Sequence, residues 1–238
     1  MRLDAMARYL QDVATDDAAD VGLADGWVLR RVSLRIERFP VFRDVVDLVT
    51  WCSGVAASVA ERRTTIAVDG RVVVDAVALW VFVGSDGRPA RLDRDRFAVY
   101  GIPTDRRIST RLRHDDPPAA DAAGVRSAPW PLRSADVDVL RHVNNAVSLA
   151  ALEDVLREWR RDDAAAPWAV EVEYRAPIEP DDRPELVWVP ATGGDVVGGL
   201  RCDGTARTTF RVSIPEPSDP ERSDVEIEAA CRPRPRAT

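Results

Sequence analysis

The sequence predicts an α+β fold in which one long helix and a set of antiparallel strands occur twice. Three observations lead to this prediction. Apolar residues near the N-terminus repeat with helical spacing, alternating apolar and polar residues typical of strands follow them, and the same order returns after a stretch rich in proline and acidic residues. A chain of 238 residues with 45% hydrophobic content can bury a core of this kind.

The first half of the chain is interpreted as one helix and four strands. An apolar stripe that starts at Leu3 and ends near Gly22 is typical of an amphipathic helix. The Asp69-Gly70 pair is a strong hairpin signal between two strands. The second of these strands is apolar on both faces, as a central strand is. The predicted elements are a helix over 3–20 and strands over 32–36, 44–51, 62–68 and 71–83.

The second half repeats this order after a predicted linker at 114–124. The predicted elements are a short strand over 130–137, a helix over 144–159, and strands over 168–175, 185–189, 196–202, 205–214 and 225–231. An antiparallel sheet wrapped around a long helix is the hot-dog arrangement, so two copies predict a tandem (double) hot-dog fold. The predicted division is an N-terminal lobe over 1–115, a linker over 116–125 and a C-terminal lobe over 126–238, which would hold the catalytic segment.

The two predicted lobes differ in one respect. The second lobe has a strand before its helix, whereas the first begins with its helix. Either the true N-terminus lies upstream of Met1, or the first lobe lacks an edge strand. An unpaired edge invites association, so we expect this edge to be covered or paired with another chain.

Composition excludes several classes of function. The formal net charge of −7 disfavours a nucleic-acid partner. No window approaches the ~18 consecutive apolar residues of a membrane span, and no signal peptide is recognisable. Cys52, Cys202 and Cys231 lack metal-ligand spacing, so neither a metal site nor a disulfide scaffold is expected. These features predict a cytoplasmic protein without a cofactor.

The segment DVDVLRHVNN, residues 136–145, carries the residue types that thioester chemistry needs. Asp138 can take a proton from water, and His142 can orient that water or share the proton. Asn144 is a plausible helix N-cap. Backbone N–H groups at a helix start can stabilise the oxyanion that forms from a thioester carbonyl. The segment is therefore the predicted active site.

At this point a family resemblance emerges. The segment DVDVLRHVNNAVSLAALEDVL resembles the catalytic segment of acyl-ACP thioesterases, of the form DxDxNxHVNNxxYxxWxxE. RIERFPVFRDVVDLVTWCSG resembles their RYPxWxDxVxxxTW stretch, and ERRTTIAVDGRVVVDAVALWVFVGSDGRPARL resembles RRxxxIxxxxGxxxxxAxSxWVxxDxxxRRPxRL. The similarity covers about residues 6–180. It implies a double hot-dog hydrolase that releases free fatty acid from acyl-ACP, or from acyl-CoA, in fatty acid biosynthesis and lipid metabolism, without a cofactor.

The resemblance assigns roles to individual residues. Asp138 and His142 match the catalytic Asp and His of the family, and Asn144 and Asn145 match its substrate-binding pair at the helix start. The chain departs from the family pattern at three positions. Leu140 replaces an Asn that helps to hold water or substrate, Pro177 or its neighbour replaces a catalytic Glu of the plant members, and Ser148 replaces a Tyr.

Other residues have both a structural and a functional interpretation. Trp51 and Trp80 are either core aromatics or the lining of an acyl tunnel in the first lobe. Glu153, Asp154 and Glu173 are either solvated acids or replacements for the missing Glu. His114 is expected to be solvated within the linker, and Cys52 to be packed.

The expected partner, acyl carrier protein, is acidic, so docking needs a local basic patch that could equally hold the phosphates of coenzyme A. The candidate patches are Arg157, Arg160 and Arg161, and Arg88, Arg91, Arg94 and Arg96. An acyl-binding protein with a degraded site is the main alternative to an enzyme, and a hot-dog dehydratase is disfavoured by the order of Asp138 and His142. Two lobes in one chain allow either a monomer or a homodimer.

Overall fold

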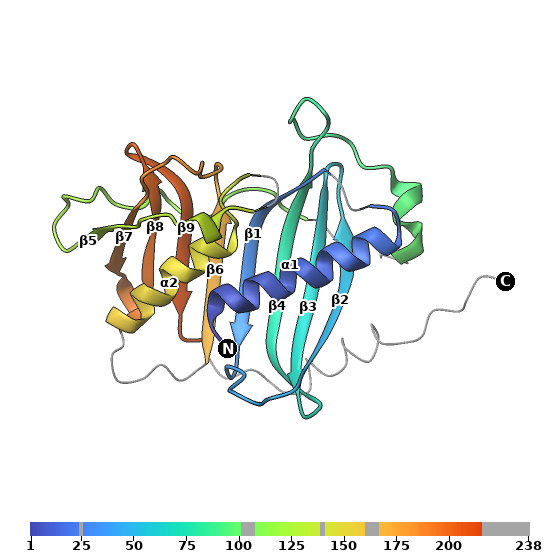
Figure 1. Cartoon of the computed structure of the whole chain (residues 1–238), viewed down its shortest axis with the longest axis horizontal. Helices are drawn as coiled ribbons and strands as arrows, with labels where there is room; N and C mark the ends of the chain where they lie inside the picture. Colours follow the sequence, from blue (N-terminus) through green and yellow to red (C-terminus); the bar gives the residue numbers. More distant parts are fainter. Residues whose placement is uncertain (24–25, 101–107, 139–140, 160–166, 216–238) are drawn as a thin grey trace.

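A single antiparallel sheet, with two helices on one of its faces, forms the body of the molecule (Figure 1). The computed structural model describes residues 1–23, 26–100, 108–138, 141–159 and 167–215. Within these residues the sheet has nine strands in the order β2-β3-β4-β1-β6-β9-β8-β7-β5. No helix in the described ranges is long and apolar enough to cross a membrane.

Each half of the chain contributes one long helix and its own strands. The first half supplies α1 (Leu3–Asp20), β1 (Trp27–Ile36), β2 (Val46–Val55), β3 (Val59–Val68), β4 (Arg71–Phe82) and the 3-10 helix η1 (Arg94–Tyr100). The second half supplies β5 (Arg126–Pro129), η2 (Ser134–Asp136), α2 (Ala146–Trp159), β6 (Trp168–Tyr174), β7 (Glu185–Pro190), η3 (Thr192–Gly194), β8 (Val196–Cys202) and β9 (Thr205–Ser213).

The two halves join through the antiparallel pair of β1 and β6, where Ser33 lies opposite Glu171 and Arg31 opposite Glu173. The main core lies between the sheet and the helices, and α2 is buried along nearly its whole first half. Leu34 and Val172, at the β1–β6 junction, belong to this core. Hydrophobic burial thus runs without a break from one half to the other. The lobe boundaries at 115 and 126 stay a prediction.

Local sequence signals locate most elements well. The Asp69-Gly70 turn is confirmed, because both residues have positive φ, 51° and 73°, as the type I′ hairpin turn requires. The predicted strands in the first half are confirmed, although β1 begins earlier, β2 ends later and β3 begins earlier than predicted. Burial on one face and periodicity of two explain why these strands could be recognised.

The strand predicted over 130–137 is wrong. The strand before α2 is β5, Arg126–Pro129, and the following residues turn into η2. Two features prevent a ladder here. Pro131 has no N–H to donate, and the carboxylate of Asp136 accepts the backbone N–H of Arg133 at 2.8 Å, which closes a local turn. The strand predicted over 225–231 lies outside the described residues.

At the outer edge of the first half, β2 is the terminal strand of the sheet in the described part of the chain. Residue Ile108 lies against this strand, since a Cβ added at Gly54 would be 2.8 Å from its side chain. Ile108 therefore packs over a face of β2 at Gly54, and the expected covering or pairing of this edge stays a prediction.

Candidate active site

The segment between η2 and α2 forms a tight loop that carries Asp138 and His142. Asp138 donates its backbone N–H to the His142 carbonyl at 2.8 Å, and its Oδ1 accepts the His142 backbone N–H at 3.1 Å. A bridge between Val137 and Val143 closes the loop, and Arg141 takes a left-handed φ of 65° within it. Asp138 thus also has a structural role, because it caps this turn. This does not exclude a role as base, because a carboxylate has about four acceptor positions.

Asn144 organises the start of α2. Its Oδ1 accepts the N–H of Ala146 at 2.8 Å, its carbonyl accepts the N–H of Val147 at 2.9 Å, and its own N–H bonds to the Asp136 carbonyl at 2.8 Å. The prediction that Asn144 caps the helix is confirmed by these contacts. The cap fixes the direction in which α2 leaves the loop that holds Asp138.

One backbone donor stands out at this helix start. Protein oxygens accept the N–H groups of residues 142–144 and 146–148. Within the described ranges, the Asn145 N–H has no such partner. It lies where the macrodipole of α2 is positive. The sequence predicted that backbone N–H groups near Asn144 act as oxyanion donors. In the structure the N–H of Asn145 is the candidate donor.

An ion pair between the exposed Arg133 and the buried Asp136 supports the loop. Asp136 is 1% exposed, and Arg133 Nη2 lies 2.8 Å from its Oδ1. Burial acts to raise the pKa of Asp136, but the bonds from Arg133 outweigh it and hold that pKa below its ordinary value. The Asp136 carbonyl in turn holds Asn144. Sequence reasoning missed this pair, although the spacing of Arg133 and Asp136 is a turn signal.

The chain after β6 returns to the loop. The Ile178 carbonyl accepts the Val143 N–H at 3.2 Å, and the Tyr174 hydroxyl donates to the Asn145 carbonyl at 3.1 Å. Burial raises the pKa of Tyr174. The position that holds a Glu in the plant pattern therefore lies next to the candidate site. In this chain Pro177 or its neighbour occupies it, and Ala176, Pro177 and Ile178 carry no carboxylate.

The three auxiliary acids lie elsewhere. Glu153 Oε2 accepts the Leu3 N–H at 3.0 Å and thereby caps the start of α1. Asp154 is exposed on α2. Glu173 is fully buried, on the face of β6 opposite to Tyr174. No described contact brings any of the three to Asp138, so the structure gives no support to an acid that replaces the missing Glu.

The two tryptophans face opposite sides of the sheet. Trp80 lines a small cavity between α1 and the sheet, together with Arg62. Trp51 is paired with Arg63, whose guanidinium lies over its ring at 5.9 Å. Because neighbouring residues of a strand alternate faces, Arg63 and Trp51 point away from α1. Only Trp80 is placed to line an acyl tunnel.

This cavity is narrow and has a polar end. Its volume is about 20 Å³, which is room for about one water molecule. Arg62 Nη1 lies 2.6 Å from Asp17 Oδ2, and the Tyr100 hydroxyl donates to the same oxygen at 2.9 Å. Burial, and then the bond to Asp17, raise the pKa of Tyr100 to about 12. In this form the cavity is too small to hold an acyl chain.

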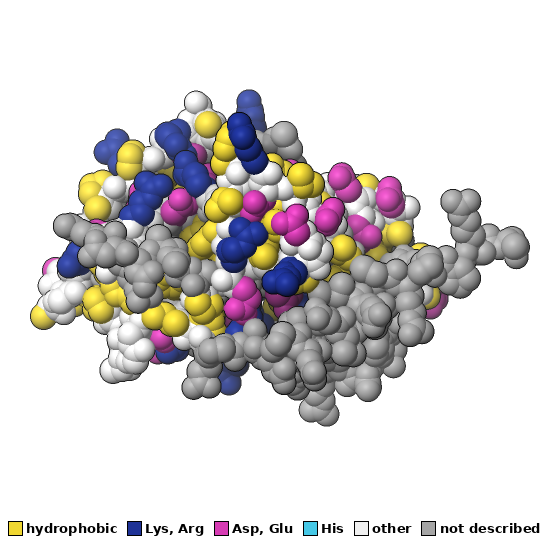
Figure 2. All heavy atoms as spheres, turned by 90° about the horizontal axis from the view of Figure 1, so that it is seen from below, with side chains coloured by type: hydrophobic (Ala, Val, Ile, Leu, Met, Phe, Trp, Pro, Cys, Tyr) yellow, Lys and Arg dark blue, Asp and Glu magenta, His cyan; other side chains and the backbone are white. Residues whose placement is uncertain are grey.

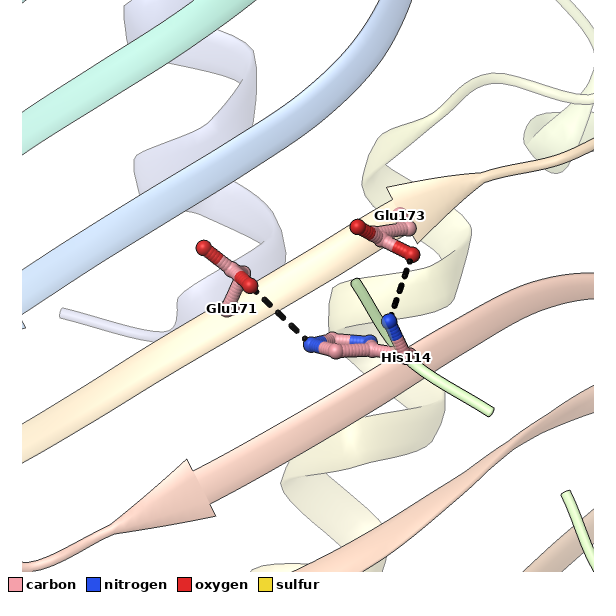
Figure 3. Close-up of side chains that lie close together, drawn as sticks. All are labelled: His114, Glu171 and Glu173. Atoms are coloured by element: carbon pink, nitrogen blue, oxygen red, sulfur yellow. Dashed lines mark hydrogen bonds and ion pairs between the residues drawn. The ribbon is translucent and has the colours of Figure 1, made fainter. Parts of the chain in front are cut away.

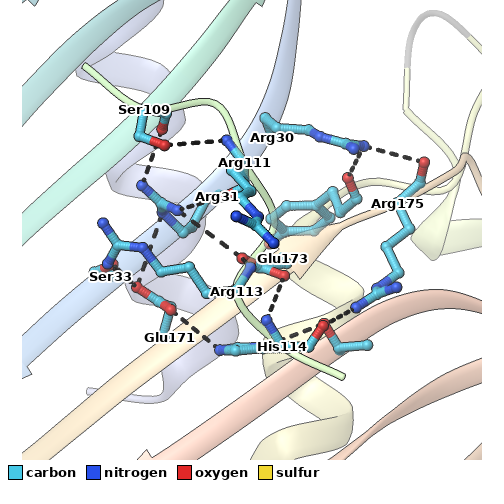
Figure 4. Close-up of polar contacts among 12 residues, drawn as sticks. Arg30, Arg31, Ser33, Ser109, Arg111, Arg113, His114, Glu171, Glu173 and Arg175 are labelled. Atoms are coloured by element: carbon cyan, nitrogen blue, oxygen red, sulfur yellow. Dashed lines mark hydrogen bonds and ion pairs between the residues drawn. The ribbon is translucent and has the colours of Figure 1, made fainter. Parts of the chain in front are cut away.

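His114 is not the solvated linker residue that the sequence suggested. Its side chain is 11% exposed, with Nε2 3.1 Å from Glu171 Oε1 and Nδ1 3.1 Å from Thr209 Oγ1 (Figure 3). The prediction was wrong because this segment crosses the outer face of the sheet. Glu173 accepts the backbone N–H groups of Arg113 at 2.7 Å and of His114 at 3.2 Å (Figure 4).

These residues also have the composition of a metal site. The ligand atoms of His114, Glu171 and Glu173 all lie within 4.8 Å of one another. Two arginines, however, contact the same carboxylates, Arg31 at 3.8 and 3.9 Å and Arg113 at 3.6 Å. They supply the positive charge that a cation would otherwise bring. The cluster thus fits an anchor that holds the linker over the β1–β6 junction.

Replacing Glu171 by Gln should remove a contribution to stability that depends on pH. The bond from His114 lowers the pKa of Glu171, burial opposes it, and Ser33 lowers it further, to about 2. The unfolded value is about 4.3. The contribution is therefore present above about pH 4.3 and is lost as pH falls through about 2. We expect the free energy of unfolding of the wild type to exceed that of the variant by roughly 1–3 kcal/mol at neutral pH.

Urea unfolding at several pH values measures this difference, which should narrow steadily below about pH 4. The exposed Glu179→Gln variant is the matched control. A difference that stays constant down to acid pH would contradict the assignment.

The arginine patches are only partly described. Arg88, Arg91 and Arg157 are exposed. Arg160 and Arg161 lie outside the described residues, as do the side chains of Arg94 and Arg96. Around the candidate site the structure adds Arg133 and Arg141, both exposed, which sequence reasoning did not select.

Comparison with known protein families shows to which family the chain belongs. The model of the acyl-ACP thioesterase N-terminal domain matches residues 1–100, and that of the C-terminal domain matches residues 121–196. The chain belongs to the acyl-ACP thioesterase family. This confirms the predicted family and enzyme class, a thioester hydrolase that acts on acyl-ACP.

Individual relatives of this thioesterase are distant. An uncharacterized Mycobacterium tuberculosis protein, Rv2001, is 26% identical over 183 residues, covering 75% of this chain and 71% of the relative. Oleoyl-acyl carrier protein thioesterase 2 of Arabidopsis thaliana is 27% identical over 226 residues, covering 83% of this chain and 60% of the plant protein. The 12:0-ACP thioesterase of Umbellularia californica superposes with a TM-score of 0.73 at 17% identity, over 90% of this chain and 89% of that one. This likeness confirms the double hot-dog fold.

Proposed function

We propose that the chain hydrolyses fatty acyl-ACP to free fatty acid in the cytoplasm, and that the loop before α2 is its active site. Asp138 acts as the base that takes a proton from water. The resulting hydroxide attacks the thioester carbonyl, the C–S bond breaks, and the thiolate leaves and takes up the proton. His142 orients the water and shares this proton.

The observation that carries the proposal is the Asn145 N–H beside the Asp138–His142 loop, which has no partner among the residues that the structure describes. A donor at the positive end of α2 suits the negative charge that develops on the carbonyl oxygen. Asn144 supports the site indirectly, because it caps the helix. Trp80 is proposed to line the path of the acyl chain. No step needs a metal or an organic cofactor.

A hydrolysis screen over acyl chain lengths, on both ACP and coenzyme A, tests the proposal. Turnover should exceed background for some chain length and should collapse in the Asp138→Asn variant. Equal rates for wild type and variant would contradict hydrolysis at this site. Both a monomer and a homodimer are compatible with the proposal.

The alternative is an acyl-binding protein whose catalysis has been lost. It is favoured by Pro177, which stands next to the site where plant relatives carry a Glu, and by Leu140, which replaces an amide. It predicts that acyl-ACP binds and is not consumed.

Restoring the amide distinguishes the two candidates. Leu140→Asn should create or raise hydrolysis, by roughly 10²-fold if the amide matters as much as a single oxyanion donor does. Single-turnover hydrolysis of acyl-ACP measures it, with thermal unfolding as the check on folding. An unchanged rate would show that the loss of this amide is not what limits the site.

A further inference from the structure

The loop between β1 and β2, residues 37–45, presents large apolar side chains to solvent. Phe42 is 90% exposed, Val45 78% and Val41 61%. The loop lies at the lower end of the sheet in Figure 1, beside the start of α1. Scattered single apolar residues on a surface need no explanation, but three within five residues mark an interaction surface.

The loop is held in one shape. Asp44 Oδ2 accepts the Val41 N–H at 2.9 Å and an Arg38 N–H at 2.9 Å, and the Asp44 N–H returns to the Val41 carbonyl at 3.2 Å. Arg43 adopts a φ of 76°, a conformation that costs free energy outside glycine. A loop fixed this way loses little conformational entropy when a partner binds.

Positive charge accompanies the apolar side chains. The Arg43 guanidinium lies 5.5 Å from the centre of the Phe42 ring. Arg2, at the start of the neighbouring α1, does not add to this charge, because its guanidinium is paired with Asp4 at 3.2 Å and Glu153 at 3.7 Å. Viewed from below, the molecule shows arginines, acidic side chains and apolar side chains mixed on this face (Figure 2). Because Arg38 is paired with Asp44, Arg43 is the cation that the loop offers to an acidic partner.

The loop is linked to the proposed active site through α1. The Met1 amino group bonds to the Pro40 carbonyl, and the Leu3 N–H bonds to Glu153 of α2 at 3.0 Å. Glu153 lies about 12 Å along the helix axis from Asn145. These contacts join the loop to α1 and α1 to α2, the helix whose start holds the proposed oxyanion donor.

We propose that residues 37–45 dock the acyl carrier protein, with Phe42 as the apolar anchor and Arg43 facing the carrier's acidic surface. The inference rests on the proposed function and names the surface that recognises its carrier. An anionic membrane fits less well, because membrane surfaces are bound by clusters of roughly 4–8 cations, whereas this loop offers Arg43 beside an Arg38 that is paired with Asp44.

Kinetics with one acyl chain on two carriers test the proposal. Phe42→Ser and Arg43→Gln should each raise KM for acyl-ACP, Phe42→Ser by about tenfold or more. The kcat for both substrates and the KM for acyl-CoA should stay unchanged, since coenzyme A has no protein surface to dock. Ile214→Ser, at an aliphatic side chain 48% exposed near the end of β9, is the matched control and should change nothing.

A titration of unacylated holo-carrier, followed by fluorescence anisotropy, gives a readout that needs no turnover. Weaker binding by Phe42→Ser supports docking even if no thioester is hydrolysed, a result that would overturn only the proposed function. Equal changes in KM on both carriers, or carrier binding that the variants leave unchanged, would overturn docking. Docking would also be overturned if the substitutions weakened only the binding of the protein to phosphatidylglycerol vesicles. The same holds if they only dissociated a dimer in analytical sedimentation.

Discussion

Replacing Asp138 by Asn should reduce kcat/KM for acyl-ACP by roughly 10²–10⁴, the usual effect of losing a general base. The substitution is close to isosteric, and the Asn oxygen can still accept the His142 N–H that Asp138 accepts at 3.1 Å. The loop before α2 should therefore keep its shape, and only the ability to take a proton from water is lost. Steady-state hydrolysis measures the rate, and thermal unfolding checks the fold.

Asp154→Asn is the matched control for this experiment. Asp154 is an exposed acid on α2 with the same chemistry, and it lies outside the loop. Its substitution should leave kcat/KM within about twofold, as is typical of surface changes. If Asp138→Asn hydrolysed at the wild-type rate, the acyl-binding alternative would become the better interpretation of the site.

The features that could be predicted from the sequence depend on neighbours in the chain. The Asn144 cap and the Asp69-Gly70 turn each follow from backbone groups within a few residues. The alternation of apolar residues located the strands for the same reason. The loop with Asp138 and His142 could be selected because its residue types stand together directly before a helix.

The features that could not be predicted depend on contacts between distant segments. His114 is half-buried and contacts Glu171, far along the chain, and Glu173 accepts the backbone N–H of His114. An acidic linker looks solvated in the sequence because nothing local reveals which strands it crosses. Phe42 is the opposite case, since an aromatic residue in a strand-rich region is expected inside and is 90% exposed. Whether a residue at such a position is buried or exposed is decided by the tertiary fold.

Replacing Asn145 by Pro should lower kcat by roughly 10²–10³ without unfolding α2. Proline removes the one N–H at this helix start that has no partner in the described structure. It is well tolerated at the first helical position, and it favours the extended conformation that a capping residue such as Asn144 adopts. Single-turnover hydrolysis of acyl-ACP reports the chemical step, and circular dichroism reports the helix.

Asn145→Ala separates the backbone from the side chain, because it keeps the N–H and removes only the amide. If the backbone donor stabilises the oxyanion, the alanine variant should retain most of the wild-type kcat while the proline variant loses it. The bond from the Tyr174 hydroxyl to the Asn145 carbonyl is available in both variants, so it cannot account for a difference. Equal losses in both would instead place the stabilising group in the Asn145 side chain, and wild-type rates in both would remove Asn145 from the mechanism.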